Sequence, residues 1–263
     1  MMSYHNPVLL VASVDGLNIK SDGVYVDVTF GGGGHSREIL SRLGKEGKLF
    51  AFDQDEDALK NTIDDERFTL IHENFRFISQ FLKFYGVRKV DGILADFGVS
   101  SHQFDVAERG FSTRFDADLD MRMSKRNTIS AYDVVNTYAY DDLRRVLPAR
   151  IAHKILAQIY QAIRIEVNQE IEVIKEFLLQ VPDLLNDKGR LSVISYHSLE
   201  DRLVKNFIRS GKFEGEPDKD FYGNMSLPLK KLGGLIAPSK KEIAANNRSR
   251  SAKLRIAEKA KVK

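Results

Sequence analysis

Two neighbouring parts of the sequence carry residues whose types and spacing suit the binding of an adenosine-containing ligand. Four consecutive glycines, Gly31 to Gly34, follow the apolar run 24–30. Such a turn lets the backbone approach a ligand closely and directs the N–H groups of a following helix at it. Asp53 lies 20 residues beyond Gly33 (53 − 33), at the end of a second apolar run, where a carboxylate can accept both hydroxyls of a ribose. The pair predicts an adenosine-type cofactor, without separating a dinucleotide from S-adenosylmethionine.

Each of these features also has a plainer interpretation. The glycine run does not satisfy G-x-G-x-x-G, because Ser36 occupies the last glycine position, and no Lys-Ser or Lys-Thr pair completes a P-loop. The run could therefore be only a tight turn, and Asp53 could cap the helix that follows it.

Further candidates for chemistry follow later strands. Asp96 ends the run Ile93-Leu94-Ala95, and because a buried carboxylate is costly without a partner, it is expected to face a ligand. His197 and Glu200 follow another strand and could serve acid–base chemistry, although Ser198 and Glu200 also suit the cap of a helix, which the sequence favours slightly. The other histidines show no metal-ligand spacing, so no metal site is expected: His5, His72, His102 and His153.

The elements that position these residues follow from hydrophobic periodicity. Strands are predicted at 24–30, 48–52, 67–72 and 91–96, and helices at 35–43, from about residue 55, and at 75–85. This alternation is typical of a parallel, doubly wound sheet, and ligands bind such a sheet outside the carboxyl ends of its strands.

Beyond residue 96 the alternation lapses. Residues 97–128 are predicted to form a long structured loop, and residues 130–185 are predicted to be helical, including 151–165 and 169–185. A strand at 189–196, a helix at about 199–209 and a strand at 253–257 complete the prediction.

Composition narrows the class of protein. The chain has 263 residues, is 43% hydrophobic and 29% charged, and contains no cysteine. A buried core is therefore expected, and disulfides, zinc-thiolate sites and a cysteine nucleophile are excluded. No apolar run approaches the ~18 residues of a membrane helix, and the N-terminus does not resemble a signal peptide. A cytoplasmic protein is expected, made of one large domain or of one domain with an insertion.

The charge is unevenly distributed. Residues 1–229 have a net charge of −6 and residues 230–263 a net charge of +9, which sum to the overall +3. A basic tail on an acidic body is typical of a protein that binds a polyanion. We expect phosphate contacts from four of its residues: Arg248, Arg250, Lys253 and Arg255.

Eight segments, in order along nearly the whole chain, resemble one family. They are YHNPVLL (4–10), DVTFGGGGHS (27–36), DFGVSS (96–101), ERGFS (108–112), LDMRM (119–123), QAIRIEVN (161–168), SYHSLEDR (195–202) and NRSRSAKLR (247–255). Together they resemble the bacterial ribosomal RNA methyltransferases of the RsmH (MraW) type.

The resemblance implies an α/β fold of the class I S-adenosylmethionine-dependent methyltransferases, which is Rossmann-like with a mostly parallel sheet and a helical insertion. It implies methylation of the exocyclic N4 of a cytosine in the 16S rRNA of the small ribosomal subunit. Phe75 would offer a face for adenine. The implied cofactor contacts are Gly33, Gly34, His35, Asp53, Phe75, Asp96 and Gln103.

The methyltransferase domain would comprise residues 1–104 and 163–263, and the loop and helical insertion residues 105–162. The sequence departs from the family here, because only 37 residues, 124–160 (160 − 124 + 1), separate LDMRM from QAIRIEVN. The family's insertion is longer, so either the insertion is trimmed or a segment is absent from this chain. The departure concerns RNA contacts from the insertion and leaves the cofactor site unaffected.

The reaction sets its own demands on these residues. Methyl transfer is an in-line displacement that depends on alignment, and the attacking amine must lose a proton. Asp96, or a carbonyl of Asp96-Phe97-Gly98, is the candidate acceptor, although the Asp-Pro-Pro-Tyr string of many amino-methyltransferases is missing. Phe97 or Phe111 could stack on the unstacked base. The alternatives are a non-catalytic RNA-binding or ribosome-assembly factor and, disfavoured by Ser36 and the basic tail, a nicotinamide-dependent dehydrogenase.

Overall fold

The computed structural model describes residues 7–147, 155–219, 221–223, 225 and 227–260. The chain divides into two compact units. The first unit comprises Met1–Gly98 and Ile174–Lys263, and the second unit comprises Val99–Val173. The predicted insertion at 105–162 lies within the second unit, and its folding as a separate domain stays a prediction.

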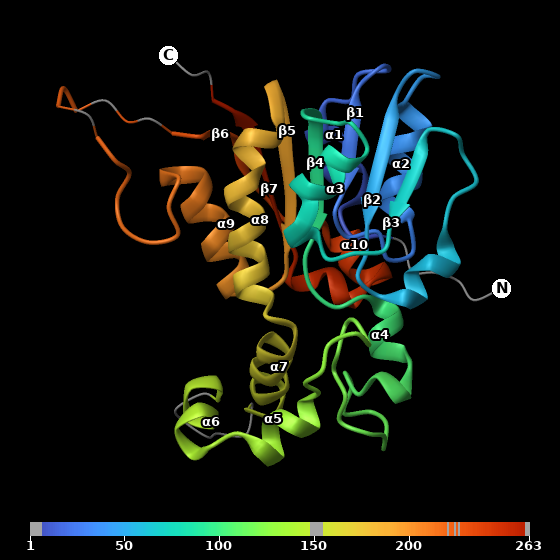
Figure 1. Ribbon diagram of the computed structural model, residues 1–263, viewed down its shortest axis with the longest axis vertical. Helices are drawn as coiled ribbons and strands as arrows, with labels where there is room; N and C mark the ends of the chain where they lie inside the picture. The colour runs from blue at the N-terminus through green and yellow to red at the C-terminus, as the bar shows by residue number, and fades with distance from the viewer. Residues whose placement is uncertain (1–6, 148–154, 220, 224, 226, 261–263) are drawn as a thin grey trace. The chain divides into compact units, whose positions relative to one another are not determined.

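A seven-stranded sheet forms the first unit, in the order β3-β2-β1-β4-β5-β7-β6 (Figure 1). Within the run β3-β2-β1-β4-β5, neighbouring strands are parallel, whereas β7 is antiparallel to both β5 and β6. The strands are β1 (Val24–Asp27), β2 (Lys48–Phe52), β3 (Phe68–Ile71), β4 (Val90–Asp96), β5 (Leu185–Ser195), β6 (Leu229–Ile236) and β7 (Lys253–Lys259). The predicted, mostly parallel α/β fold is confirmed, and β6 is an edge strand that the sequence did not predict.

Helices cover both faces of this sheet. One face packs against α3 (Ile78–Phe84), α8 (Glu170–Leu184) and α9 (Ser198–Ser210), and the other against α1 (Leu10–Leu17) and α2 (Gly34–Arg42). Shorter elements complete the unit: the 3₁₀ helices η1 (Glu56–Asn61), η2 (Phe75–Phe77) and η4 (Asn247–Ser251), and α10 (Lys240–Ala245).

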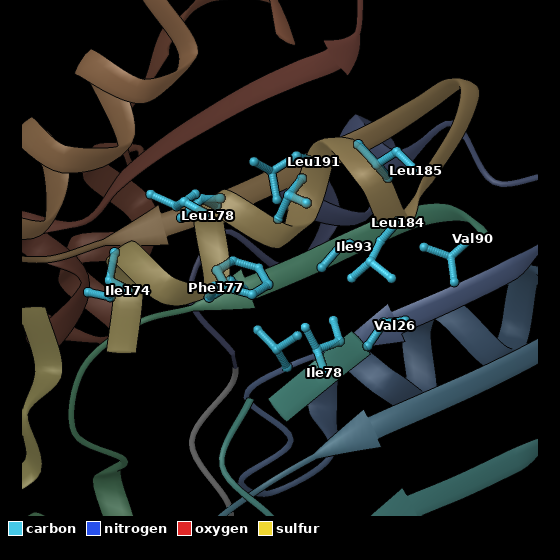
Figure 2. Packing of buried hydrophobic residues seen from close by; sticks show 14 of the residues in the cluster. Val26, Ile78, Val90, Ile93, Ile174, Phe177, Leu178, Leu184, Leu185 and Leu191 are labelled. Atoms are coloured by element: carbon cyan, nitrogen blue, oxygen red, sulfur yellow. The ribbon is translucent and has the colours of Figure 1, made fainter. Parts of the chain in front are cut away.

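Alternation along the strands divides the core between these two faces. Val26 and Ile93 pack with Ile78 and Phe177 on one face (Figure 2). Tyr25, which precedes Val26 in β1, belongs to the cluster on the other face. Because both faces are covered, the middle of each central strand is largely apolar, as in buried parallel strands. This burial fixes the register and so the place where each strand ends.

The carboxyl ends of β1, β2 and β4 meet at one edge of the sheet. β1 lies between β2 and β4, so the chain runs in opposite directions across the sheet from this point. Such a topological switch point is where ligands bind open α/β sheets. The glycine turn, Asp53 and Asp96 all lie at this edge.

The second unit is mainly helical and has its own core. Its elements are α4 (Ser101–Asp105), η3 (Ala107–Arg109), α5 (Ala131–Thr137), α6 (Tyr140–Val146) and α7 (Ile155–Asn168). Asn168 joins the end of α7 to the LDMRM segment: its Oδ1 accepts the Met123 N–H at 2.7 Å, and its Nδ2 donates to the Met121 carbonyl at 2.8 Å. A buried ion pair joins Arg164 to Glu170 at 2.7 Å.

One prediction about this region needs correction, and a second is tested only in part. Residues 97–128 are not wholly a loop, because α4 and η3 form within them. The helix predicted at 151–165 is described only from Ile155, and residues 151–154 lie outside the described residues. No helix of the described residues is long and apolar enough to cross a membrane.

Candidate functional site

The glycine turn joins β1 to α2 in a conformation that depends on glycine. Gly31 and Gly33 have φ values of +51° and +75°, in the left-handed region. A Cβ on Gly34 would lie 2.1 Å from Cγ of Pro7, whereas a Cβ on Gly31 would meet nothing within 4 Å. Gly33 is the N-cap of α2 and provides no side-chain cap. The helix therefore presents its first-turn N–H groups without a side chain that caps them.

Asp27, for which no role is predicted from the sequence, connects this turn to the end of β1. Ser36 Oγ donates to Asp27 Oδ2 at 2.7 Å, and the Thr29 N–H donates to Oδ1 at 3.1 Å. The residue is fully buried, and this burial raises the pKa of Asp27 to about 6, although hydrogen bonds from Ser36 and from the backbone and side chain of Thr29 lower it in part. Its signal in the sequence is an acidic residue inside an otherwise apolar strand.

Asp53 links the end of β2 to the same turn. The Gly31 N–H donates to Oδ2 at 2.7 Å, and the Asp55 N–H donates to Oδ1 at 2.8 Å. Burial of the carboxylate raises the pKa of Asp53 to about 6, and these two hydrogen bonds offset part of that rise. The cap of η1 is Asp55 rather than Asp53. Each Asp53 oxygen retains a lone pair with which it can accept a ligand hydroxyl.

Asp96 ends β4 and lies between two other side chains. The Tyr196 hydroxyl donates to Oδ1 at 2.9 Å, and His35 Nδ1 lies 3.9 Å from Oδ2. Burial raises the pKa of Asp96 to about 6, while His35 and Tyr196 lower it in part. The Asp96 N–H also donates to Thr29 Oγ1 at 2.7 Å, so the β1 and β4 ends are bound together.

His35 is the second residue of α2, and its second ring nitrogen, Nε2, contacts the backbone of Val8. Its Nε2 lies 3.2 Å from the Val8 carbonyl oxygen. Because that carbonyl can only accept, Nε2 carries a hydrogen, and Nδ1 is the ring atom directed at Asp96.

Glu200 caps α9. Its Oε2 accepts the N–H groups of Tyr196 and His197 at 2.9 and 3.1 Å, as the capping interpretation of this segment predicted. His197 is the half-buried N-cap residue. A direct chemical role for either residue stays a prediction.

The aromatic residues near β4 form part of the core. Phe75 is half-buried, and its ring centroid lies 5.9 Å from that of Phe97 and 5.4 Å from that of Phe177. Phe75 thus keeps some surface with which to contact an adenine. The predicted stacking of the target base on Phe97 or Phe111 is wrong for this structure, because these side chains are only 3% and 5% exposed in their respective cores.

Gln103 belongs to the second unit. There it forms a capping box at the start of α4: its Oε1 accepts the Ser100 N–H, and its own N–H donates to Ser100 Oγ, both at 3.1 Å. Its contact with a cofactor stays a prediction.

The four basic residues predicted to bind RNA have different environments. Arg250 is exposed and Arg248 half-exposed, both on η4. Arg255 and Lys253 contact Asp201 of α9, with Nε and Nζ at 2.7 and 3.4 Å from its oxygens. Burial would raise the pKa of Asp201, but these cations outweigh it, and the net pKa is lowered. Lys253 and Arg255 therefore hold β7 to α9.

The sheet order, together with the acidic strand ends, defines the fold class of this protein. The fold is Rossmann-like and is that of the class I methyltransferases. An rRNA methylase from Streptococcus thermophilus has a TM-score of 0.50 and 14% identity, covering 99% of this chain and 100% of that one. TrmN from Thermus thermophilus has a TM-score of 0.51 and 12% identity, covering 96% of this chain and 48% of that one. At these identities the likeness concerns the fold alone.

Sequence comparison gives the family. The profile of the MraW methylase family matches residues 2–155 and 148–260, and the chain belongs to this family. Ribosomal RNA small subunit methyltransferase H of Flavobacterium johnsoniae is 62% identical over 297 residues, covering 98% of each chain. The protein of the same name from Bacteroides fragilis is 50% identical, again covering 98% of each chain. Family membership excludes the nicotinamide-dependent dehydrogenase alternative.

The alignment with the Flavobacterium relative is longer than this chain. It spans 297 residues, whereas the chain has 263, so at least 34 aligned positions (297 − 263) have no counterpart here. The two matched ranges of the family profile meet at residues 148–155, inside the 124–160 segment of the second unit.

Proposed function

We propose that this protein transfers a methyl group from S-adenosylmethionine to the exocyclic N4 of a cytosine in the 16S rRNA of the small ribosomal subunit. The observation that carries the proposal is membership of the MraW methylase family at 62% identity to a ribosomal RNA small subunit methyltransferase H. The strand-end site of the first unit supplies residues suited to this cofactor and to this reaction.

The donor groups of the site fit S-adenosylmethionine. The first-turn N–H groups of α2, at Gly34 and His35, suit the cofactor's carboxylate, since a helix N-terminus favours an anion. Asp53 would accept the ribose hydroxyls, and Phe75 would contact the adenine. Asp96, with Asp27 and Glu200 nearby, gives the site a negative potential that suits the cofactor's ammonium and sulfonium groups.

The cofactor supplies an electrophilic methyl group on a sulfonium centre. The protein's contribution is to align the cytosine amine with that methyl and to accept a proton from it. Asp96 is the candidate acceptor, because its pKa of about 6 leaves it mainly ionised at neutral pH and yet more basic than an ordinary aspartate.

RNA binding would draw on the basic C-terminal segment 230–263. Arg248 and Arg250 are the residues of that segment best placed to contact phosphates, because Lys253 and Arg255 already contact Asp201. These contacts would be independent of sequence and would weaken as the salt concentration rises.

The test uses small ribosomal subunits from cells that lack this activity. They would be incubated with the protein and methyl-labelled S-adenosylmethionine, and the RNA digested to nucleosides and separated. Label in N4-methylcytidine would establish the reaction and the substrate together. Measurable cofactor binding without any label in the RNA would refute the proposal and favour a binding-only role in ribosome assembly.

A further inference from the structure

Tyr196 touches the site, and no role has been assigned to it. It follows the last residue of β5, and its ring packs against an apolar cluster that includes Ile194 and Leu254. Its N–H donates to Glu200 Oε2 at 2.9 Å. Ring and backbone are thus both held, so the place of the hydroxyl is fixed by the fold.

That hydroxyl is a hydrogen-bond donor to Asp96. Tyr196 Oη lies 2.9 Å from Asp96 Oδ1. Burial, together with the nearby Asp96, raises the pKa of Tyr196 well above 10, so the phenol keeps its proton over the pH range in which Asp96 titrates. A hydrogen bond donated to a carboxylate stabilises its ionised form.

The two oxygens of Asp96 therefore differ. Oδ1 accepts from Tyr196, whereas Oδ2 lies 3.9 Å from His35 Nδ1, a distance beyond that of a hydrogen bond. Other ionisable groups influence this pair: Asp27 of β1 and Glu200 of α9 act on Asp96, and Glu242 of α10 acts on Tyr196. Asp27 and Glu200 oppose ionisation of Asp96, and Glu242 opposes ionisation of Tyr196, whereas Tyr196 and His35 favour ionisation of Asp96.

We propose that Tyr196 is a positioning residue for methyl transfer, whose hydroxyl fixes Oδ1 of Asp96 and keeps the carboxylate ionised, so that Oδ2 accepts the proton of the attacking amine. This rests on the proposed function. In the step, the amine nitrogen forms a bond to the methyl carbon and the carbon–sulfur bond breaks, with its electron pair remaining on sulfur. One N–H proton passes to Oδ2, which leaves a neutral methylated amine.

The test is Tyr196→Phe, which removes the hydroxyl and keeps the ring. Two quantities are measured. The first is the titration midpoint of Asp96, by carbon NMR of ¹³C-labelled aspartate, with the Asp96 signal identified by its absence from the spectrum of Asp96→Asn. The second is the pH profile of single-turnover methylation. We expect both the midpoint and the acidic limb to rise by about one pH unit, the scale of one hydrogen bond to a charged group. The rate should fall about tenfold below the midpoint and recover towards that of the unaltered protein at pH 8.

Tyr25→Phe is the matched control. Tyr25 is buried in the other core cluster, and its hydroxyl accepts the Lys20 N–H at 2.7 Å. Its loss should lower the thermal unfolding temperature and leave both the Asp96 midpoint and the pH profile unchanged.

The proposal fails if Tyr196→Phe leaves the Asp96 midpoint unchanged, or lowers the rate by the same factor at every pH. Absence of methylation by the unaltered protein refutes the proposed function instead. In that case the carboxyl titration still decides whether Tyr196 controls the ionisation of Asp96.

Discussion

Replacement of Asp27 by asparagine should make the protein more resistant to rising pH. Asp27 is fully buried, accepts hydrogen bonds from Ser36 and Thr29, and has no basic partner among these contacts. Asparagine has nearly the same shape: its oxygen can accept the Thr29 N–H, and its amide can donate to the Ser36 hydroxyl. The substitution thus keeps the hydrogen bonds and removes the cost of a buried charge.

The magnitude follows from the pKa of Asp27. It is raised from 3.8 to about 6 in the folded protein, so the folded state binds more protons than the unfolded state between these values. Stability therefore falls as the pH rises through this window. About two pKa units correspond to about 3 kcal/mol between pH 3 and pH 8, of which roughly half lies between pH 5 and pH 8. Asp27→Asn should lack this loss.

The measurement is urea unfolding followed by circular dichroism, because the chain contains no tryptophan. The difference in unfolding free energy between Asp27→Asn and the unaltered protein should grow by about 1–2 kcal/mol from pH 5 to pH 8. Ser36→Ala is the opposite perturbation, because it removes a hydrogen-bond donor to Asp27 and so raises the pKa of Asp27 further. The free energy of unfolding of this variant should fall more steeply as the pH rises. A pH-independent difference for Asp27→Asn would show that Asp27 is not a buried acid with a raised pKa.

Three further predictions concern ligands. Asp53→Ala should weaken cofactor binding by about 1.5–3 kcal/mol, the scale of hydrogen bonds to a charged group; unchanged affinity by calorimetry would remove Asp53 from the cofactor site. Asp96→Asn should slow single-turnover methylation while the circular dichroism spectrum stays that of the unaltered protein, and an undiminished rate would leave Asp96 with a structural role only. Replacing Arg248 and Arg250 by alanine should lower RNA affinity and reduce its salt dependence by about one phosphate contact per arginine, and an unchanged salt slope in filter binding would contradict a role in RNA binding. This double substitution is preferable to removing residues 246–263, because that truncation would delete β7, which pairs with both β5 and β6.

The parts of the site that sequence could predict are those set by strand ends. Gly33, Asp53 and Asp96 each follow an apolar run, and in a parallel sheet such ends converge at one edge. No contact between them had to be known in advance, since the topology alone brings them together. The central strands could also be located from sequence, because burial on both faces makes them largely apolar.

What sequence could not predict depends on side chains far apart in the chain. The hydrogen bond from Tyr196 to Asp96 joins residues 100 positions apart, and the ion pair from Arg255 to Asp201 joins residues 54 apart. A run of basic residues looks the same in sequence whether its cations are free or paired. For the same reason the sequence does not show that the Phe97 side chain is buried in the core, where it cannot stack on a base. Strand β6 was missed because its pattern, Leu-Lys-Lys-Leu-Gly-Gly-Leu-Ile, lacks strict alternation and contains two glycines, which weaken a strand prediction.

The acidic residues of the strand-end site connect its stability to its function. Burial raises the pKa values of Asp27, Asp53 and Asp96 to about 6, and Asp27 raises those of the other two. Above that pH the fold carries several negative charges near one another, at a cost in stability. A cation bound there would lower these pKa values and recover part of that cost. Cofactor affinity should therefore increase as the pH rises through about 6, with protons released on binding below it. Calorimetry in buffers of different ionisation enthalpy would detect that release, and affinity independent of pH between 5 and 8 would show that these carboxylates do not lie near the ligand's cationic groups.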